Sequence, residues 1–215
     1  MASRGGTDHG TTRRALTQRA VDVVVAAIVL ALTWPILAGA ALAVRLTMGP
    51  PVLYEDLRAG RGGKPFVLLK FRTMRDLLPG ERIPDDDHRR VTRVGRLLRS
   101  TSVDELPSVL NVLMGDMSIV GPRPLPVRYV DRYSTRQARR LEVRPGITGW
   151  AQVNGRNELG WEERFELDVW YVDHRSLALD ARIVARTVGD VVGRKGISHE
   201  GHGTMPEFGA VDGSS

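Results

Sequence analysis

The segment VVVAAIVLALTWPILAGAALAV, residues 23–44, contains no charged side chain. About 20 apolar residues are enough to cross the hydrocarbon core of a bilayer, so this segment predicts a membrane helix. Pro35 stands near its middle. Proline lacks a backbone N–H and its ring clashes with the carbonyl four residues earlier, so a kink is expected there. Each half then has about 18 Å of helix, enough to enter a membrane partway and turn back.

Both flanks of this segment are basic. The residues concerned are Arg13, Arg14 and Arg19 before it, and Arg45, Arg58, Arg61 and Lys64 after it. Because Lys and Arg next to membrane helices collect on the cytoplasmic side, both ends are predicted to lie there. A re-entrant helix kinked at Pro35 satisfies these observations, whereas length alone favours a single spanning helix. The hydroxyl of Thr33 can bond a carbonyl of the preceding turn and so support the bend.

The composition limits the class of protein. The 215 residues are 42% apolar, with 31 basic and 25 acidic side chains and a net charge of +6, which suits one domain plus a membrane element. The positive balance favours an anionic partner: nucleic acid, an anionic lipid leaflet or a phosphorylated substrate. No module typical of nucleic-acid binding is recognisable, so no nucleic-acid partner is expected. The absence of cysteine excludes disulfides, zinc–thiolate sites and thiol catalysis.

Four regions are predicted along the chain. Residues 1–18 form a disordered tail, 19–47 the re-entrant membrane helix, 48–203 a cytoplasmic domain, and 204–215 a flexible C-terminal tail. Apolar runs around a glycine-rich turn predict a β-hairpin within 52–75. Helices are predicted at 91–98, 103–113, 125–142, 162–171 and 177–192, with a loop at 143–160. The fold class is an α-rich α/β membrane protein whose globular domain carries amphipathic interfacial helices and a small hairpin. The helix at 177–192 has a one-sided apolar stripe, which can lie on a membrane surface or pack on the core.

Two adjacent carboxylates form the first chemical candidate. Asp104 and Glu105 point about 100° apart on a helix and could flank one site. A purely structural explanation competes with this, because Ser102 and Glu105 match a capping box at a helix start. Acidic residues in a first turn also complement the helix dipole.

Basic residues in turn-rich segments form the second candidate. The arginine guanidinium pairs with phosphate oxygens in bidentate fashion, so such a set suits a polyanionic phosphate substrate. Together with two carboxylates it also suits a divalent metal. Each of these side chains could equally be solvated on the surface. The candidates are Lys70, Arg72, Arg99, Arg123, Arg144 and Arg156.

Several motifs occur together in a fixed order. They are RAVD (19–22), GKPF (63–66), KFRTM (70–74), SVDELP (102–107), NVL (111–113), GDMS (115–118), GPRP (121–124) and RPGITGWAQVNGR (144–156). In this order they resemble the monotopic bacterial phosphoglycosyltransferases, also called the bacterial sugar transferase family. The resemblance covers about residues 19–202 and indicates a minimal form consisting of the catalytic domain, since the extra N-terminal spanning helices of larger relatives are missing.

The resemblance implies a reaction and a place for it. A UDP-sugar is the donor and polyprenyl (undecaprenyl) phosphate the acceptor, at the cytoplasmic face of the bacterial inner membrane, and UMP is released. Asp104 is the implied nucleophile, forming a covalent phosphosugar–aspartate, and Glu105 supports it. Mg²⁺ is the implied cofactor, held by Asp104 and Glu105, and the basic residues above are implied phosphate ligands. The sugar and the glycan pathway stay open, and a homodimer is not excluded.

Two other functions remain open at this stage. An ordinary glycosyltransferase would move the sugar alone, release UDP and need no covalent intermediate. A non-catalytic, membrane-anchored basic adaptor would bind anionic lipid or nucleic acid through its arginines.

Overall fold

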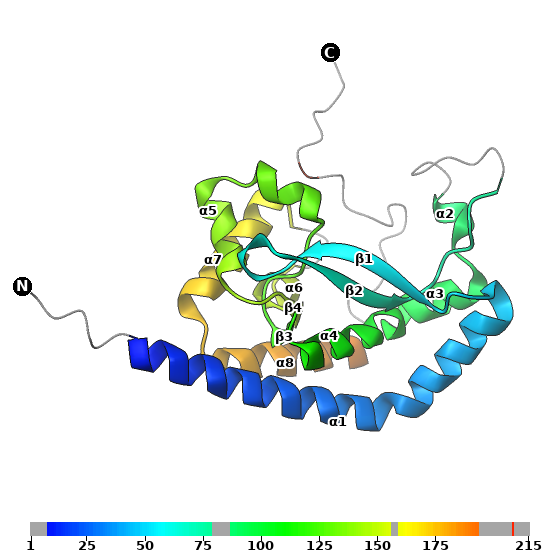
Figure 1. Cartoon of the computed structure of the whole chain (residues 1–215), viewed down its shortest axis with the longest axis horizontal. Coiled ribbons are helices and arrows are strands. Elements are labelled where there is room, and N and C mark those ends of the chain that lie inside the picture. The colour runs from blue at the N-terminus through cyan, green and yellow to red at the C-terminus, as the bar shows by residue number, and fades with distance from the viewer. Residues whose placement is uncertain (1–7, 79–86, 156–158, 194–207, 209–215) are drawn as a thin grey trace, which may run out of the picture.

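The computed structural model describes residues 8–78, 87–155, 159–193 and 208 (Figure 1). This part of the chain is rich in helix and contains two small two-stranded sheets. The α-helices are α1 (Asp8–Met48), α2 (Asp87–Arg90), α3 (Arg93–Ser100), α4 (Val109–Met114), α5 (Thr135–Ala138), α6 (Trp150–Val153), α7 (Trp161–His174) and α8 (Leu177–Val192). The 3₁₀ helices are η1 (Arg61–Gly63), η2 (Val103–Ser108), η3 (Val127–Arg132) and η4 (Arg139–Glu142). The strands are β1 (Leu53–Ala59), β2 (Pro65–Phe71), β3 (Ser118–Val120) and β4 (Gly146–Thr148).

Helix α1 is the long apolar helix that the sequence predicts, and it has 41 residues. It begins at Asp8, inside the segment 1–18 for which a disordered tail is predicted, and residues 1–7 lie outside the described part. The helix continues through Pro35 and changes direction partway along its length (Figure 1). The Thr33 hydroxyl donates to the carbonyl of Val29 at 2.7 Å, as expected for a residue that supports a bend.

Most of α1 faces outward. Its stretch from Ala15 to Met48 has a mean hydropathy of 2.4 in its most apolar window, and 11% of that window is buried. By length and composition the helix could cross a membrane, and its exposure sets it apart from the core helix of a soluble protein. Large apolar side chains such as Ile28, Leu32 and Trp34 are more than half exposed.

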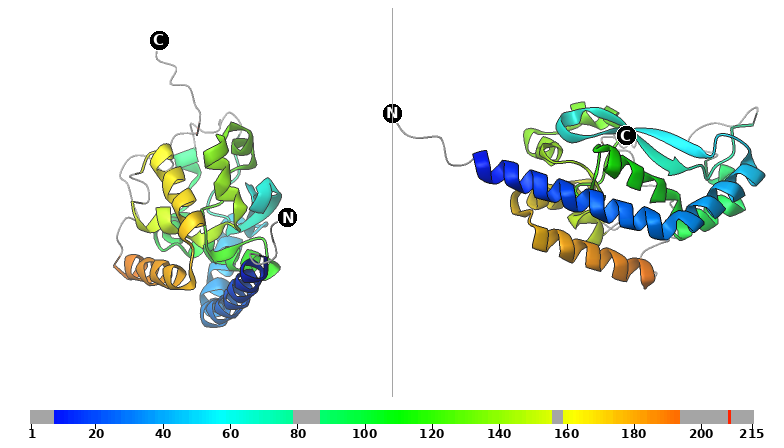
Figure 2. Two further views of the ribbon diagram at one scale, coloured as in Figure 1. Left: turned by 90° about the vertical axis from the view of Figure 1, so that its left-hand side faces the viewer. Right: turned by 60° about the horizontal axis from the view of Figure 1, so that its bottom comes forward.

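The inner side of α1 packs on the globular domain at two places. Near the start of the apolar segment, Ala26 is buried in a cluster with Phe66, Leu68 and Val112. Near its C-terminal end, Ala40 and Val44 are buried against Phe71 and Leu98. Helix α8 lies along the same lower face of the molecule (Figure 2). One domain therefore contacts both ends of the apolar helix.

The predicted hairpin is confirmed, and its register brings a lysine to the centre of the molecule. Strands β1 and β2 are antiparallel, with Tyr54 opposite Lys70 and Asp56 opposite Leu68. Side chains alternate between the two faces of a strand, so Phe66, Leu68 and Lys70 all point toward η2 and α4. The side chain of Asn111 secures the outer edge of β2 by accepting from the Leu69 N–H and donating to the Val67 carbonyl.

The predicted loop at 143–160 contains ordered structure instead. Strand β4 pairs in parallel with β3, with Ser118 opposite Gly146 and Val120 opposite Thr148. Glycine permits this close approach: a Cβ on Gly146 would lie 2.1 Å from the Gly121 nitrogen, and one on Gly149 would lie 2.2 Å from the Gly121 oxygen. Helix α6 follows immediately. The glycines of the GPRP and RPGITG motifs therefore allow the two backbone segments to pack directly against each other.

Two predicted helices are also broken. The segment 103–113 begins as the 3₁₀ helix η2 and becomes α-helical at Val109. Pro107 explains the break, because it lacks the N–H that a continuous α-helix would bond to the carbonyl of Val103. The segment 125–142 consists of η3, α5 and η4, with a capping box formed by Ser134 and Gln137.

The helices at the C-terminal end of the described domain agree with the sequence. Helix α7 extends the predicted segment to His174. On α8, Leu179 and Ile183 are buried, so packing on the core is confirmed for one side of this helix. Its other side leaves Leu177, Val188 and Val191 exposed.

The close approach of β3 and β4 can be tested with matched glycine variants. Gly121→Ala places a Cβ 2.4 Å from the Arg144 carbonyl oxygen, so it should lower the free energy of unfolding by about 3 kcal/mol. Gly189→Ala, in an open position on α8, should raise it by up to about 1 kcal/mol because alanine favours helix. Thermal unfolding of the detergent-solubilised protein measures both. Equal stability of the two variants would contradict the packing described here.

Candidate active site

The dyad Asp104–Glu105 lies at the start of η2, and the structure rejects its explanation as a capping box. Ser102 adopts a left-handed backbone conformation, with φ of 56°, and its side chain makes no cap hydrogen bond. A non-glycine residue in that region costs free energy and signals a locally imposed geometry. The turn at Ser102 redirects the chain after α3, and Asp104 and Glu105 then line the same cavity.

Glu105 is clamped by two cations from different parts of the chain. Lys70 on β2 donates to Oε1 at 3.0 Å. Arg123 donates to both carboxylate oxygens, with its second nitrogen 3.2 Å from Oε2. Burial alone would raise the pKa of Glu105, but the charges and hydrogen bonds of Arg123 and Lys70 outweigh it and lower that pKa. Glu105 is therefore a fixed anion at any physiological pH.

Asp104 lies in a different environment, although it is the next residue. None of the ion pairs among the described residues involves it. Burial and the neighbouring charge of Glu105 raise its pKa to about 6, against smaller opposite effects of Lys70 and Arg99. Two carboxylates whose pKa values are driven apart are typical of sites in which they have different roles. Asp104 is the one that remains available for chemistry.

The dyad opens into a cavity of about 570 Å³. One part of its wall is charged and includes Arg99, Arg123 and Arg164 beside the dyad. Another part is formed by the apolar and hydroxyl-bearing side chains of α6, β4 and α8: Ile147, Thr148, Ala151, Val153, Thr187 and Val191. A cavity of this size accommodates a ligand with both anionic and less polar parts.

The six predicted phosphate ligands do not all meet here. Lys70, Arg99 and Arg123 lie at the dyad, and the Nε of Arg99 also donates to the Thr73 hydroxyl at 2.9 Å. Arg72 is buried and bonds to the carbonyls of Pro50 and Met74. Arg72 therefore fixes the end of the hairpin, and its role as a phosphate ligand stays a prediction.

Arg144 and Arg156 complete the predicted set. The Nε of Arg144 donates to the Gly115 carbonyl at 2.9 Å, in the turn between α4 and β3, and Arg144 does not line the cavity. Arg144 therefore holds this turn of the backbone, and its role as a phosphate ligand stays a prediction. Arg156 lies outside the described residues, so its prediction is not tested.

Three side chains beside the dyad or the cavity were not predicted from the sequence. Arg140 and Asp168 form a buried ion pair, 2% and 4% exposed, with a nitrogen–oxygen distance of 2.8 Å. Arg140 also donates to the backbone carbonyl of Arg123 at 2.7 Å, so this pair fixes the residue that clamps Glu105. Arg164 is a third arginine on the cavity wall, and burial lowers its pKa. All three lie on helices or turns without a local motif, so only the tertiary fold reveals them.

The residues of the site fit a magnesium ion that binds to few protein ligands. Among the described residues no group of three His, Cys, Asp or Glu side chains could hold a metal. Mg²⁺ often binds through one or two carboxylates and completes its shell with water and substrate phosphates. Asp104 and Glu105 would supply such carboxylates, beside arginines placed for the phosphates.

Comparison with known proteins gives one consistent family. A family model described as bacterial sugar transferase matches residues 13–194. The chain is 49% identical over 203 residues to the uncharacterised sugar transferase EpsL of Bacillus subtilis (strain 168), covering 93% of this chain and 100% of that protein. It is 47% identical over 189 residues to the UDP-glucose:undecaprenyl-phosphate glucose-1-phosphate transferase of Caulobacter vibrioides, covering 80% of this chain and 68% of that protein. The transferase of the same name from Escherichia coli (strain K12) is 44% identical over 187 residues, and the match spans 39% of its length.

The raised pKa of Asp104 predicts that this residue costs stability when ionised. The folded state favours its protonated form, so that cost grows as pH rises from the ordinary pKa of 3.8 to about 6, and it is constant above that pH. Asp104→Asn should therefore raise the free energy of unfolding by about 1–2 kcal/mol at pH 8 and by much less at pH 4. Asp131→Asn, at an exposed carboxylate on η3, serves as the control and should leave both values unchanged. A loss of stability in Asp104→Asn at pH 8, measured by denaturant unfolding in detergent, would refute the assignment.

Proposed function

The chain belongs to the bacterial sugar transferase family, and on that premise we propose that it is a phosphoglycosyltransferase acting on undecaprenyl phosphate. We further propose that the donor is a UDP-sugar and that UMP is released. The observation that carries the proposal is the asymmetric dyad: one carboxylate clamped by two cations and one left available at a cavity with three arginines.

The proposed reaction has two displacements at one phosphorus. An oxygen of ionised Asp104 attacks the sugar-bearing phosphate of the donor, the bond from that phosphorus to the bridging oxygen breaks, and UMP leaves. A phosphate oxygen of the polyprenyl phosphate then attacks the phosphosugar–aspartate. The bond to the Asp104 oxygen breaks, which regenerates the carboxylate and yields a polyprenyl diphosphate-sugar. A carboxylate nucleophile divides one difficult transfer into two easier ones.

The side chains around the dyad have defined tasks in this scheme. Lys70 and Arg123 keep Glu105 ionised and in place, and Arg123 and Arg164 face the charge of the phosphates from the cavity wall. Positioning and charge neutralisation are the main needs of phosphoryl transfer. A magnesium ion held by Asp104 and Glu105 would add further neutralisation of phosphate charge.

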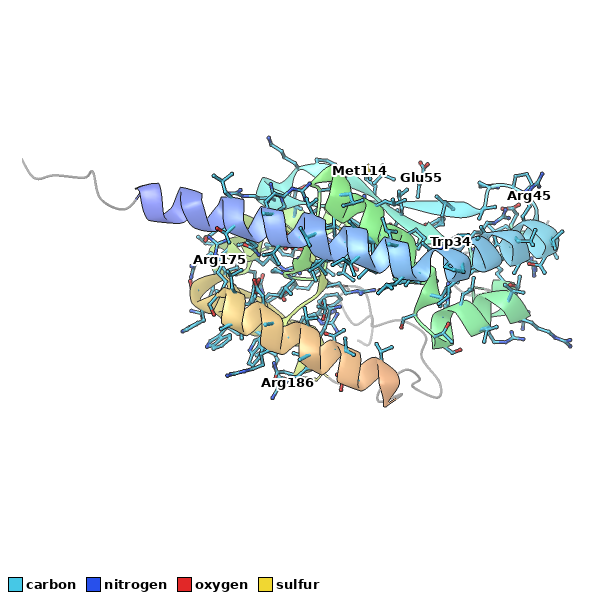
Figure 3. The ribbon with its side chains drawn as sticks, turned by 90° about the horizontal axis from the view of Figure 1, so that it is seen from below. Trp34, Arg45, Glu55, Met114, Arg175 and Arg186 are labelled. Carbon is cyan, nitrogen blue, oxygen red and sulfur yellow. The ribbon has the colours of Figure 1, made fainter. Side chains whose placement is uncertain are left out.

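We also propose that α1 is a re-entrant membrane helix and that the domain lies on the cytoplasmic face. The contacts of Ala26, at one end of the apolar segment, and of Val44, at the other end, are both with the same domain. The outward side of α1 is apolar over the region around Trp34 (Figure 3). An apolar segment that contacts one globular domain at both ends and bends between them is suited to enter one leaflet of the membrane and return.

The product of the reaction tests the proposed function directly. The purified protein is incubated with magnesium, undecaprenyl phosphate and a panel of UDP-sugars, and the released nucleotide is identified. UMP from one donor is the expected result, and Asp104→Asn should abolish it whereas Asp131→Asn should not. Release of UDP would instead indicate an ordinary glycosyltransferase. Binding of anionic lipid that survives in Asp104→Asn, without turnover of any donor in the native protein, would favour the adaptor.

The pH dependence of the first displacement tests the role of Asp104 separately. Without acceptor, one equivalent of UMP should appear in a single burst as the aspartate is modified. The rate of that burst should fall about tenfold per pH unit below about 6, because the protonated carboxyl is not a nucleophile. Omitting the acceptor removes the titration of its own phosphate. A burst rate that is constant between pH 5 and 8 would exclude the assignment.

The topology can be tested by labelling single cysteines in the otherwise cysteine-free chain. Cysteines at Leu16 and Leu46, both exposed and at opposite ends of the apolar stretch, should react with an impermeant reagent from the same side of sealed vesicles. A cysteine at Leu32, near the bend, should be protected. Labelling of the two end positions from opposite sides would establish a spanning helix instead.

A further inference from the structure

A buried carboxylate lies in the membrane helix, away from the dyad. Asp22 on α1 is 4% exposed, although most of the surrounding helix faces outward. Burying a carboxylate is costly unless it is paired and hydrogen-bonded. The hydrogen bonds of Asp22 therefore indicate its role in the structure.

Asp22 binds the first residues of strand β3. The Ser118 hydroxyl lies 2.9 Å from each of its carboxylate oxygens, and the Ile119 N–H donates to Oδ1 at 2.9 Å. Ser118 is itself 2% exposed, so this contact is sealed from solvent. A carboxylate that accepts from a backbone N–H fixes the position of the strand and not just of a side chain.

Two arginines fix the turn that precedes β3. Arg19, one helical turn before Asp22, donates to the carbonyls of Val112 and Leu113 at the end of α4. Arg144 donates to the Gly115 carbonyl. Both positive charges act on the Asp22 carboxylate. Arg19 and Asp22 of α1 therefore hold the two ends of the α4–β3 connection, and Arg144 holds its middle.

Strand β3 leads directly to the clamp on Glu105. The Gly121 N–H donates to the Thr148 carbonyl at 2.9 Å, and the Gly146 N–H donates to the Pro122 carbonyl at 3.0 Å. These bonds make β3, β4 and the GPRP turn one rigid unit, and Arg123 follows at once. Arg123 then reaches Glu105.

We propose that Asp22 is a positioning residue, which sets Arg123 against Glu105 by holding β3 to the membrane helix. The inference rests on the proposed function for its consequence in catalysis, but its structural part does not. On this proposal, Arg123 can bind Glu105 in the observed geometry only when α1 is packed on the domain. If α1 did not pack on the domain, Arg123 would no longer be held against Glu105.

Hydrogen exchange tests the structural part without any activity. Asp22→Ala should increase exchange in the segments 103–108 and 119–124, because it leaves Ser118 and the Ile119 N–H without their acceptor. Asp22→Asn keeps one acceptor oxygen and should show a smaller increase, which covers the case in which the alanine variant folds poorly. Val44→Ala is the control for the segment 119–124, since it removes a buried contact from the other end of the apolar segment, in a cluster that includes Val103 but no residue of β3. Unchanged protection of 103–108 in both Asp22 variants would overturn the proposal.

A double-mutant cycle tests the catalytic consequence. Asp22→Ala should slow the UMP burst by about tenfold or more, as expected when a site is misplaced by a fraction of an ångström. Adding it to Arg123→Ala should slow the burst no further, because the two residues act through one contact. The effect of Val44→Ala should be small and independent of Arg123. Fully additive losses for Asp22 and Arg123 would overturn the positioning role.

Failure of the proposed function would look different. In that case the native protein would release no UMP, while the exchange pattern of the Asp22 variants would still decide whether this residue assembles the dyad.

Discussion

Glu105 and the two cations that hold it are the interaction on which the site depends. Lys70 comes from the hairpin, Arg123 from the turn after β3, and Glu105 from η2, so one carboxylate joins three separate parts of the chain. The side chains of this clamp are 18–37% exposed, so removing one partner should cost less than the about 3–5 kcal/mol that is typical of a fully buried pair. The buried pair of Arg140 and Asp168 secures Arg123 from behind. The clamp therefore joins the hairpin, η2 and the turn after β3.

The clamp also creates the difference between the two carboxylates. A fixed negative charge at Glu105, next to Asp104 in the chain, is one reason why the pKa of Asp104 rises to about 6. Burial is the larger cause. In the proposed reaction, a carboxylate that is less stable as an anion gains more when it bonds to phosphorus or binds a metal ion, so the stability lost in the free protein would become binding or reactivity in the complex. The left-handed backbone of Ser102 belongs to the same strained arrangement.

The sequence predicts well those features that depend on local pattern. The hairpin follows from two apolar runs around glycines, α8 from its periodic stripe, and the bend in α1 from Pro35. The sequence does not predict features that depend on contacts between residues far apart in the chain. Strands β3 and β4 have three residues each, too few for a pattern, and exist because Gly121 and Gly146 allow two turns to touch. The same limit applies to the site: Asp104 and Glu105 stand in a motif, but nothing near Arg72 or Arg144 reveals that each binds backbone carbonyls.

The length of α1 constrains how the protein meets a membrane. Asp22 and Val44 are buried against the same domain, and the helix between them covers about 33 Å at 1.5 Å per residue. That is about the full thickness of the hydrocarbon core. If this stretch crossed the bilayer straight, the domain that contacts both residues would have to lie within the lipid, together with Lys70, Arg123 and Glu105. In the proposed re-entrant topology a bend near Pro35 removes the conflict, because both anchored ends would stay at one surface while the apolar middle enters the membrane. The same anchoring joins the dyad to the membrane helix, so the site would be complete only where its lipid acceptor is found.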